Sequence, residues 1–241
     1  MKKRITVVSI YIALLLSLTA CGRSKDVLAV EGAISDIGVV TLDSADSIKY
    51  AQEMFDRLPE SDRQDVSNYQ ELVNATETLS QMEEAYYQEC YDLAVDKMLD
   101  NLVIAEELCN LTLAVWHNSI WQVDSDDTNP YTKDENGEFF DDFNDALYNL
   151  CNSTDYQSMR EEILSNDAEL NNYLDIIKMP PEKFKGNMLD AFINYYAEYQ
   201  SFIEFALNYN ESYNSFSEKF DQIDETSIEA YRKAAFYTST Y

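Results

Sequence analysis

The chain has 241 residues, of which 17 are basic and 45 acidic, so its formal net charge is −28 at pH 7. This balance disfavours nucleic acid as a partner, because proteins that bind phosphate backbones carry basic surfaces. Hydrophobic residues make up 46% of the sequence, enough to fill a core and to exclude the disordered class. Five glycines and four prolines are few for the turns of a β-sandwich or a two-lobed α/β binding protein, which favours helices.

The first twenty residues have the organisation of a cleaved signal peptide. Three basic residues at positions 2–4 precede an apolar run, residues 5–18, that is too short to span a bilayer comfortably. The small residues before Cys21 resemble the lipobox of bacterial lipoproteins. This resemblance implies that Cys21 carries a diacylglyceryl group and anchors the protein at the outer face of the cytoplasmic membrane. The alternative is an ordinary secretory signal with an incidental cysteine.

Cleavage would make the protein still more acidic. Loss of residues 1–20 removes three basic residues and no acidic one, which leaves 14 basic and 45 acidic residues and a net charge of −31. Cations, cationic peptides or basic protein patches suit such a chain as partners. The alternative interpretation is that the charges solvate helix faces. Residues 21–32 are expected to form a lipid-anchored tether, with folded sequence beginning near Ala33.

Residues 33–79 predict a small module of three helices. Asp43 or Ser44 is a suitable cap for the first helix. Pro59 ends this helix and, with Glu60, opens a short second one, and Asn68 is expected to cap the third. The positions that carry a wider similarity are Ile37, Gly38, Val39, Val40, Thr41, Leu42, Asp43, Ser44, Ile48, Ala51, Leu58, Val66, Asn68, Tyr69 and Leu72.

These positions resemble a small helical module that recurs in surface lipoproteins and wall proteins of Gram-positive bacteria. Ser67 stands where the pattern has Thr. The resemblance covers about a fifth of the chain and implies a surface setting in a Gram-positive-type bacterium, with a structural or recognition role. It transfers no catalytic residue. The second half of the chain resembles uncharacterised Gram-positive lipoproteins more weakly.

Residues 68–124 contain no glycine or proline, and their apolar residues recur at steps of three and four, which predicts a helix. About 50 helical residues would extend about 75 Å, whereas a compact domain of this size has a radius of gyration near 17 Å. The helix either breaks near residues 86–92 or its first half projects and carries the small module. We expect projection, or a gentle bend.

Further helices are expected after a long loop, residues 124–138. Pro180 and Pro181 should stop one helix and start the next, on which apolar and aromatic residues form a stripe. The members of this stripe are Phe184, Met188, Phe192, Tyr195, Tyr199, Phe202, Ala206 and Tyr209. Residues 80–241 are therefore expected to form an antiparallel helical bundle, and the whole chain to be all-α.

The acidic residues around this loop are a candidate calcium site. They are Asp124, Asp126, Asp127, Asp134, Glu135, Glu138, Asp141 and Asp142. The segment lacks the EF-hand spacing, because Thr132 and Phe143 fall where carboxylates should lie when Gly137 is aligned with the turn glycine. A solvated acidic loop is the expected alternative, so we assign no metal ligand.

The sequence gives weaker indications of catalytic residues and of a disulfide. The single histidine, His117, is expected to be structural, and no nucleophile-elbow motif supports a catalytic triad. We therefore predict no catalytic residue and no cofactor. Cys109 and Cys151 would face one another if the loop reverses the chain, and both a disulfide and two buried thiols remain open.

Several tyrosines near the C-terminus could line a groove for sugars or aromatic ligands, although an aromatic stripe at helical spacing is more often core. These are Tyr195, Tyr196, Tyr199, Tyr209 and Tyr213. Because Tyr196 and Tyr213 fall off the stripe, they are the better candidates for exposed contacts. The sequence favours a non-enzymatic, membrane-anchored surface protein that binds another protein or presents a module at the wall. The alternative is a small-ligand or cation-binding receptor subunit associated with a transporter.

Overall fold

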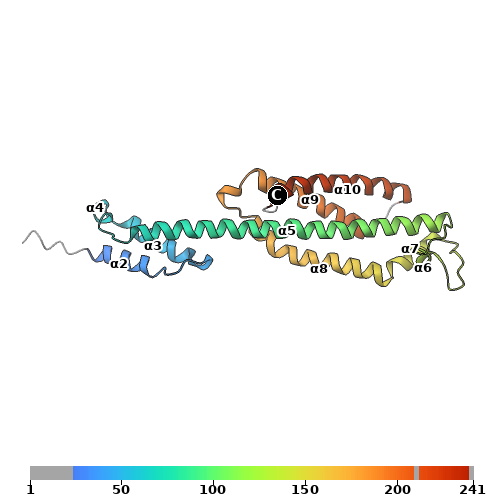
Figure 1. Cartoon of the computed structure of the whole chain (residues 1–241), viewed down its shortest axis with the longest axis horizontal. Helices are drawn as coiled ribbons and strands as arrows, with labels where there is room; N and C mark the ends of the chain where they lie inside the picture. Colours follow the sequence, from blue (N-terminus) through green and yellow to red (C-terminus); the bar gives the residue numbers. More distant parts are fainter. Residues whose placement is uncertain (1–23, 209–211, 239–241) are drawn as a thin grey trace, which may run out of the picture. The chain divides into compact units, whose positions relative to one another are not determined.

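The computed structural model describes residues 24–208 and 212–238, in which helices form the regular structure (Figure 1). The β-type pairing found in these ranges is an isolated antiparallel bridge between Lys133 and Phe139. The prediction of an all-α fold is therefore confirmed. The chain divides into unit 1, Met1–Glu83, and unit 2, Glu84–Tyr241. Helix α5, Tyr69–Ile120, contributes its first part to unit 1 and the remainder to unit 2.

Unit 1 contains short helices and the beginning of α5. In chain order they are α2 (Lys25–Ser35), the 3-10 turn η1 (Leu42–Ser44), α3 (Ala45–Arg57) and α4 (Glu60–Arg63). Their buried side chains form one core, nearly all of it aliphatic. The core consists of Val27, Val30, Ile34, Ile48, Ala51, Phe55, Leu58, Val66, Leu72, Ala75 and Leu79. The three predicted module helices are thus present, and α2 precedes them.

Helix α2 corrects the prediction that folded sequence begins near Ala33 after a tether of residues 21–32. Ser24 caps the helix by accepting a hydrogen bond from the Val27 backbone N–H at 3.2 Å. Val27 and Val30 are buried in the core of unit 1. Lys25 and Asp26, just before these valines, give the segment the mixed charge that suggested a tether. From Lys25 onward, residues of the predicted tether belong to the folded unit.

The cap of α3 also differs in detail from the prediction. Ser44 does occupy the N-cap position of α3, but its side chain makes no capping hydrogen bond to that helix. Instead its hydroxyl accepts a hydrogen bond from the Thr41 backbone N–H at 2.9 Å and closes the preceding turn, η1. The expected hydroxyl therefore stabilises the entry to the helix one turn earlier than predicted.

Helix α5 runs without interruption from Tyr69 to Ile120, so the alternative of a break near residues 86–92 is excluded. It ends in a left-handed residue, Gln122, with φ of 49°. The Val123 N–H donates to the Asn118 carbonyl oxygen at 2.9 Å, which is the hydrogen bond that this kind of helix end provides. The chain consequently turns sharply just after Trp121.

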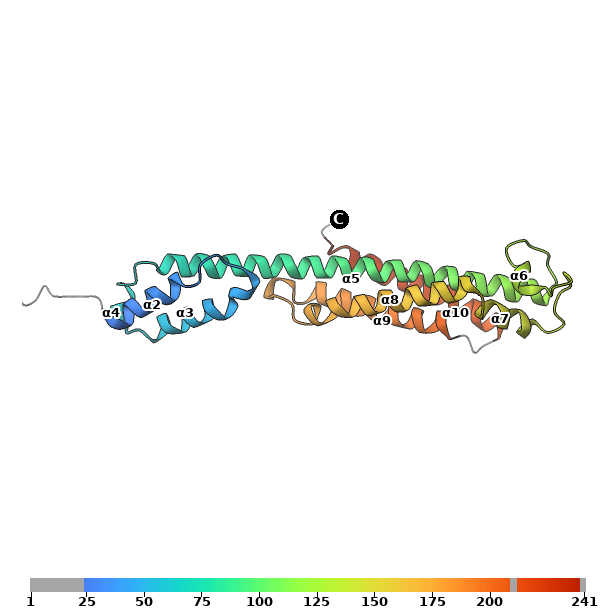
Figure 2. The same cartoon turned by 90° about the horizontal axis from the view of Figure 1, so that it is seen from below.

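Unit 2 is a bundle of four long helical segments in which successive helices alternate in direction (Figure 1, Figure 2). They are the later part of α5, α8 (Thr154–Ile177), α9 (Asn187–Leu207) and α10 (Tyr213–Ala235). Hydrogen bonds across the bundle agree with this topology, since Tyr87 donates to the Ile177 carbonyl at 3.2 Å and Tyr91 donates to the Ala234 carbonyl at 2.9 Å. Alternating directions are typical of bundles with short connections.

Two connections within unit 2 depart from the predictions. The expected long loop contains a short helix, α6 (Asn129–Thr132), and is followed by α7 (Phe143–Cys151). After Pro181 the chain forms a 3-10 turn, η2 (Glu182–Phe184), and α9 begins only at Asn187. Gly186 separates them with φ of 85°, a conformation that favours glycine. The double proline therefore ends α8 as predicted but does not start α9.

The core of unit 2 is rich in aromatic side chains. The predicted stripe on α9 is confirmed from Met188 to Ala206, and its aromatic members are at most 3% exposed. Phe184 is buried from η2 rather than from α9. Tyr209 lies outside the described residues. On α10, Ser227 and Ala230 are buried, whereas Ile228 is only partly buried.

Residues 1–20 and Cys21 also lie outside the described ranges. Within those ranges, none of the helices combines the length and the apolar character that crossing a bilayer requires. The anchor at Cys21 therefore stays a prediction from the sequence.

Candidate functional site

A buried polar network joins three helices of unit 2. Asn101 of α5 is completely buried, and its amide nitrogen donates to the Ile163 carbonyl at 3.1 Å and to the Tyr199 hydroxyl oxygen at 2.7 Å. Its amide oxygen accepts a hydrogen bond from Asn166 of α8 at 2.8 Å. Tyr199 in turn donates its hydroxyl proton to the Asp167 carboxylate. The network thus fixes Asp167 from inside the bundle.

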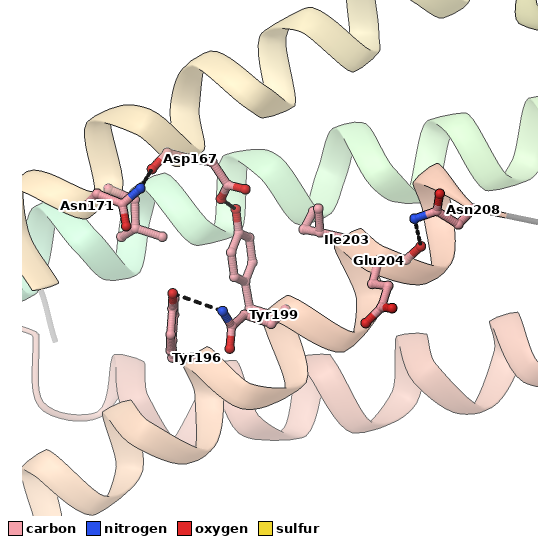
Figure 3. Close-up of a pocket in the computed structure, with 9 residues that line it drawn as sticks. Asp167, Asn171, Tyr196, Tyr199, Ile203, Glu204 and Asn208 are labelled. Atoms are coloured by element: carbon pink, nitrogen blue, oxygen red, sulfur yellow. Dashed lines mark hydrogen bonds between the residues drawn. The ribbon is translucent and has the colours of Figure 1, made fainter.

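Asp167 stands at a polar cavity of about 580 Å³ between α8 and α9 (Figure 3). Ligand sites are commonly of this size. The cavity is lined by Asp167, Leu170, Asn171, Tyr196, Tyr199, Gln200, Ile203, Glu204 and Asn208. Figure 3 shows the Asp167 carboxylate meeting the Tyr199 hydroxyl, with Tyr196 also on the facing helix. The lining combines two carboxylates with amides and phenols and includes no basic residue.

Burial and negative charge together act on the two phenols. Burial raises the pKa of Tyr199 above its usual range, and the hydrogen bond to Asp167 raises it further. Burial also raises the pKa of Tyr196, and the Asp167 charge acts in the same direction, whereas Lys178 opposes it. Both phenols therefore keep their protons at neutral pH and serve as neutral hydrogen-bonding groups.

A smaller apolar hollow of about 160 Å³ continues along the same pair of helices. It is lined by Leu174, Ile177, Lys178, Leu189, Phe192, Ile193 and Tyr196. Tyr196 borders both hollows, and its ring lies between those of Phe192 and Tyr199, with centroid distances of 6.4 Å and 6.2 Å. We name the two hollows together the α8–α9 groove, which has a polar half and an apolar half.

A second candidate surface lies where α5 ends. The terminal aromatic cluster consists of Trp116, His117, Trp121, Phe143 and Tyr213. The Trp121 ring lies 4.5 Å from the His117 ring and 5.5 Å from the Tyr213 ring, yet Trp121 is 55% exposed. Trp116 is buried and contacts Phe216 of the core at 6.2 Å. The cluster therefore passes from the core to the surface.

Exposed acidic residues lie close in the sequence to members of this cluster. Asp126 and Asp127 follow Trp121 within one short segment and are exposed, as are Asp141 and Asp142 before Phe143. Asn118 holds the segment in place, because its amide nitrogen donates to the Thr128 hydroxyl at 2.9 Å. An apolar aromatic surface is thus bordered by negative charge.

The acidic loop does not gather its carboxylates around one point. Among the residues that the structure describes, no group of three or more His, Cys, Asp or Glu side chains is placed to hold a metal ion. Asp124 pairs with Lys133 at 2.9 Å, which lowers the pKa of Asp124. Asp134 accepts hydrogen bonds from the backbone N–H groups of Asn136 and Glu138, which lower its pKa. These two carboxylates act in a salt bridge and a turn.

His117 is half-buried, and its Nδ1 lies 2.9 Å from the Asn118 side-chain oxygen. It contacts Trp121 and Tyr213 rather than a serine or cysteine nucleophile. Its observed neighbours make it part of the terminal aromatic cluster, a setting that the sequence did not indicate.

The two cysteines that the sequence left open, Cys109 and Cys151, form no disulfide. Both nevertheless lie near Tyr156, whose pKa is raised to about 12, chiefly by burial and in part by these thiols. Burial also raises the pKa of the Cys109 thiol to about 12. A thiol with such a pKa is a poor nucleophile at neutral pH.

Of the five tyrosines singled out in the sequence, the structure brings Tyr196 and Tyr199 together in the groove and places Tyr213 in the terminal aromatic cluster. Tyr195 belongs to the core. Sequence reasoning missed Asp167 and Glu204, because two carboxylates among 45 acidic residues carry no distinguishing signal.

Comparisons with protein-family models, with curated proteins and with solved structures found no match.

Proposed function

We propose that this protein is a non-enzymatic binding protein, held at the outer face of the cytoplasmic membrane of a Gram-positive-type bacterium by a lipid at Cys21. The signal-like residues 1–20 and the lipobox-like residues before Cys21 support the location. A diacylglyceryl group supplies two chains, which is enough for stable anchoring.

The terminal aromatic cluster is the observation that carries the binding role. Trp121 is more than half exposed although it packs against His117 and Tyr213. Tryptophan and tyrosine are enriched among residues that dominate protein interfaces. Because exposed carboxylates border the cluster, its partner is a protein surface with an apolar centre and a basic rim.

Photo-crosslinking in intact cells tests this role. A photoreactive amino acid in place of Trp121 should capture one protein, and the same group in place of Phe236, which is 74% exposed, should not. The double variant Asp126→Asn, Asp127→Asn should reduce capture from position 121, and added salt should reduce it in the unchanged protein. Equal capture from positions 121 and 236 would contradict a binding role for the cluster.

The anchor has a separate test. Cys21→Ser should move the protein from the membrane fraction to the culture medium or wall fraction, while Cys90→Ser, at a buried thiol of unit 2, should leave it with membranes. Continued sedimentation of the Cys21→Ser protein with membranes would refute the lipid anchor.

A second candidate function is a small-ligand or cation-binding receptor subunit that works with a transporter. The α8–α9 groove favours it, because polar groups converge there on a cavity of ligand size.

A further inference from the structure

The α8–α9 groove combines two chemically unlike halves. The polar half holds the Asp167 and Glu204 carboxylates together with three amide side chains. The apolar half presents Leu174, Ile193 and other apolar groups, and Ile193 is 55% exposed. Asp167 and Leu174 are seven residues apart on α8, which is about 10 Å along the helix axis. A ligand that fills both halves must therefore be elongated and amphipathic.

The charges in the groove determine which sign of charge a ligand should carry. None of the residues lining the polar half is basic, so two carboxylates face the cavity without a lining cation. Lys97 lies near the buried network but forms its salt bridge with Glu169 at 2.9 Å. Lys178 lines the apolar half, and it pairs with Asp175 at 3.3 Å. The large negative charge of the whole chain also concentrates cations near its surface.

The Asp167 carboxylate in the polar half is held in place by the buried network. Tyr199 is 1% exposed and links the Asp167 carboxylate to the completely buried Asn101. One carboxylate oxygen of Asp167 accepts the Tyr199 hydroxyl, and the carboxylate retains further acceptor positions for a donor in the cavity. Rigid positioning reduces the conformational entropy that binding must overcome.

Tyr196 joins the two halves. It borders both hollows, and its hydroxyl accepts a hydrogen bond from Gln200 at 3.0 Å. The face of a tyrosine ring attracts a cation, and its carbon atoms pack well against an apolar chain. A ligand lying along the groove would therefore meet a suitable surface at each point of its length.

We propose that the α8–α9 groove binds an organic cation with an apolar tail, its ammonium or guanidinium group held by the Asp167 carboxylate and its tail lying past Tyr196, while Glu204 adds negative charge to the polar half. This inference deepens the second candidate function and rests on it. It does not depend on the terminal aromatic cluster, which lies at the end of α5. Two sources present this chemistry, a free amphipathic amine and a basic side chain of a peptide beside apolar residues.

Calorimetric titration of the chain from residue 21 to 241, carrying Cys21→Ser, tests the groove with defined probes. Octylamine should bind at a single site, and it should bind at least about tenfold more tightly than octanol or methylamine. Octanol has the tail without the charge, and methylamine has the charge without the tail. The peptide amide Lys-Leu-Leu is the second probe. Tighter binding of octylamine would identify a free amine as the ligand, and tighter binding of the peptide would identify a basic side chain of a peptide.

Single substitutions locate the site. Asp167→Asn keeps the size of the side chain and an acceptor for Tyr199, and it should weaken octylamine binding by about tenfold. Glu204→Gln should weaken it less, because it removes only a more distant charge. Glu218→Gln, at an exposed carboxylate of α10, is the matched control and should leave binding unchanged. Tyr196→Ala should weaken octylamine more than methylamine, because it removes the surface that the tail contacts.

Three outcomes would overturn the proposal. These are octanol or methylamine binding as tightly as octylamine, Glu218→Gln weakening binding as much as Asp167→Asn, and the absence of binding by both octylamine and the peptide. Since crosslinking from position 121 reports the protein partner separately, failure in the titration leaves the role of the terminal aromatic cluster standing.

Discussion

The two units of this protein have cores of different chemistry. The core of unit 1 is aliphatic apart from Phe55, and among the described residues only one buried polar residue, Ser44, belongs to it. The core of unit 2 contains many aromatic rings, and it buries Asn101, Thr112 and other polar residues. Aliphatic burial stabilises a fold without orienting particular groups, whereas buried hydrogen bonds and ring contacts fix positions. This difference is the reason that our proposals place binding in unit 2.

Removing one aromatic ring from unit 2 should have the largest effect on stability. Phe216 is 1% exposed and lies 4.5 Å from Phe205 and 6.2 Å from Trp116, measured between ring centroids. Phe216→Ala should reduce the free energy of unfolding by about 3–5 kcal/mol, because it leaves a cavity. Both tryptophans lie in unit 2, so urea unfolding followed by tryptophan fluorescence measures the stability of unit 2 directly. A loss below about 1 kcal/mol would show that this core is not closely packed.

The buried amide should have the next largest effect. Asn101→Ala removes three hydrogen bonds and should destabilise unit 2 by about 2 kcal/mol. It should also weaken octylamine binding, because Tyr199 and Asp167 lose their support. Asn171→Ala, at an exposed amide of the same groove, is the control and should change stability by less than about 0.5 kcal/mol. If both variants were equally stable, the network would not be what positions Asp167.

Alkaline pH should act on unit 2 before unit 1. Burial raises the pKa of Tyr87 to about 12, while an unfolded tyrosine titrates near 10. The folded state therefore resists ionisation, so its stability is complete below pH 10 and declines as the pH rises toward 12. The described tyrosines of unit 1, Tyr50 and Tyr69, are exposed. Hydrogen exchange, resolved by peptide and measured at rising pH, reports which unit opens first. Opening of unit 1 before unit 2 would contradict this prediction.

The smallest expected effect concerns the turn after α5. Gln122 has φ of 49°, a conformation that glycine adopts at lower cost. Gln122→Gly should therefore stabilise the protein, by no more than about 1 kcal/mol. Asn118→Gly would be the opposite control, because it places glycine inside the helix and removes the contact to Thr128. Thermal unfolding of the two variants shows whether each substitution raises or lowers the stability of the protein.

The sequence predicted what depends on local periodicity. The run without glycine or proline over residues 68–124 indicated α5, and the stripe on α9 indicated its buried face. The spacing also separated Tyr196 from the core tyrosines, and this residue does border the groove. Such features follow from the period of a single helix, so one sequence is enough to find them.

Features that need contacts between distant segments could not be predicted. Asn101 has no local signal, because its three hydrogen bonds depend on residues 62 or more positions away. Helix α2 was hidden because Val27 and Val30 are flanked by the charged residues Asp26 and Glu31, and their burial depends on packing with the rest of unit 1. The turn at η2 depends on Gly186, whose backbone conformation cannot be read from its type alone.

The most direct test of binding through unit 2 compares two exposed aromatic positions in the same lipidated protein. A photoreactive amino acid replaces Trp121 in unit 2 or Tyr50 in unit 1, which are 55% and 60% exposed, and crosslinking is performed in intact cells. Our account predicts that position 121 captures a single protein and that position 50 does not capture it. Capture of that protein from position 50, with none from position 121, would contradict the account and assign recognition to unit 1.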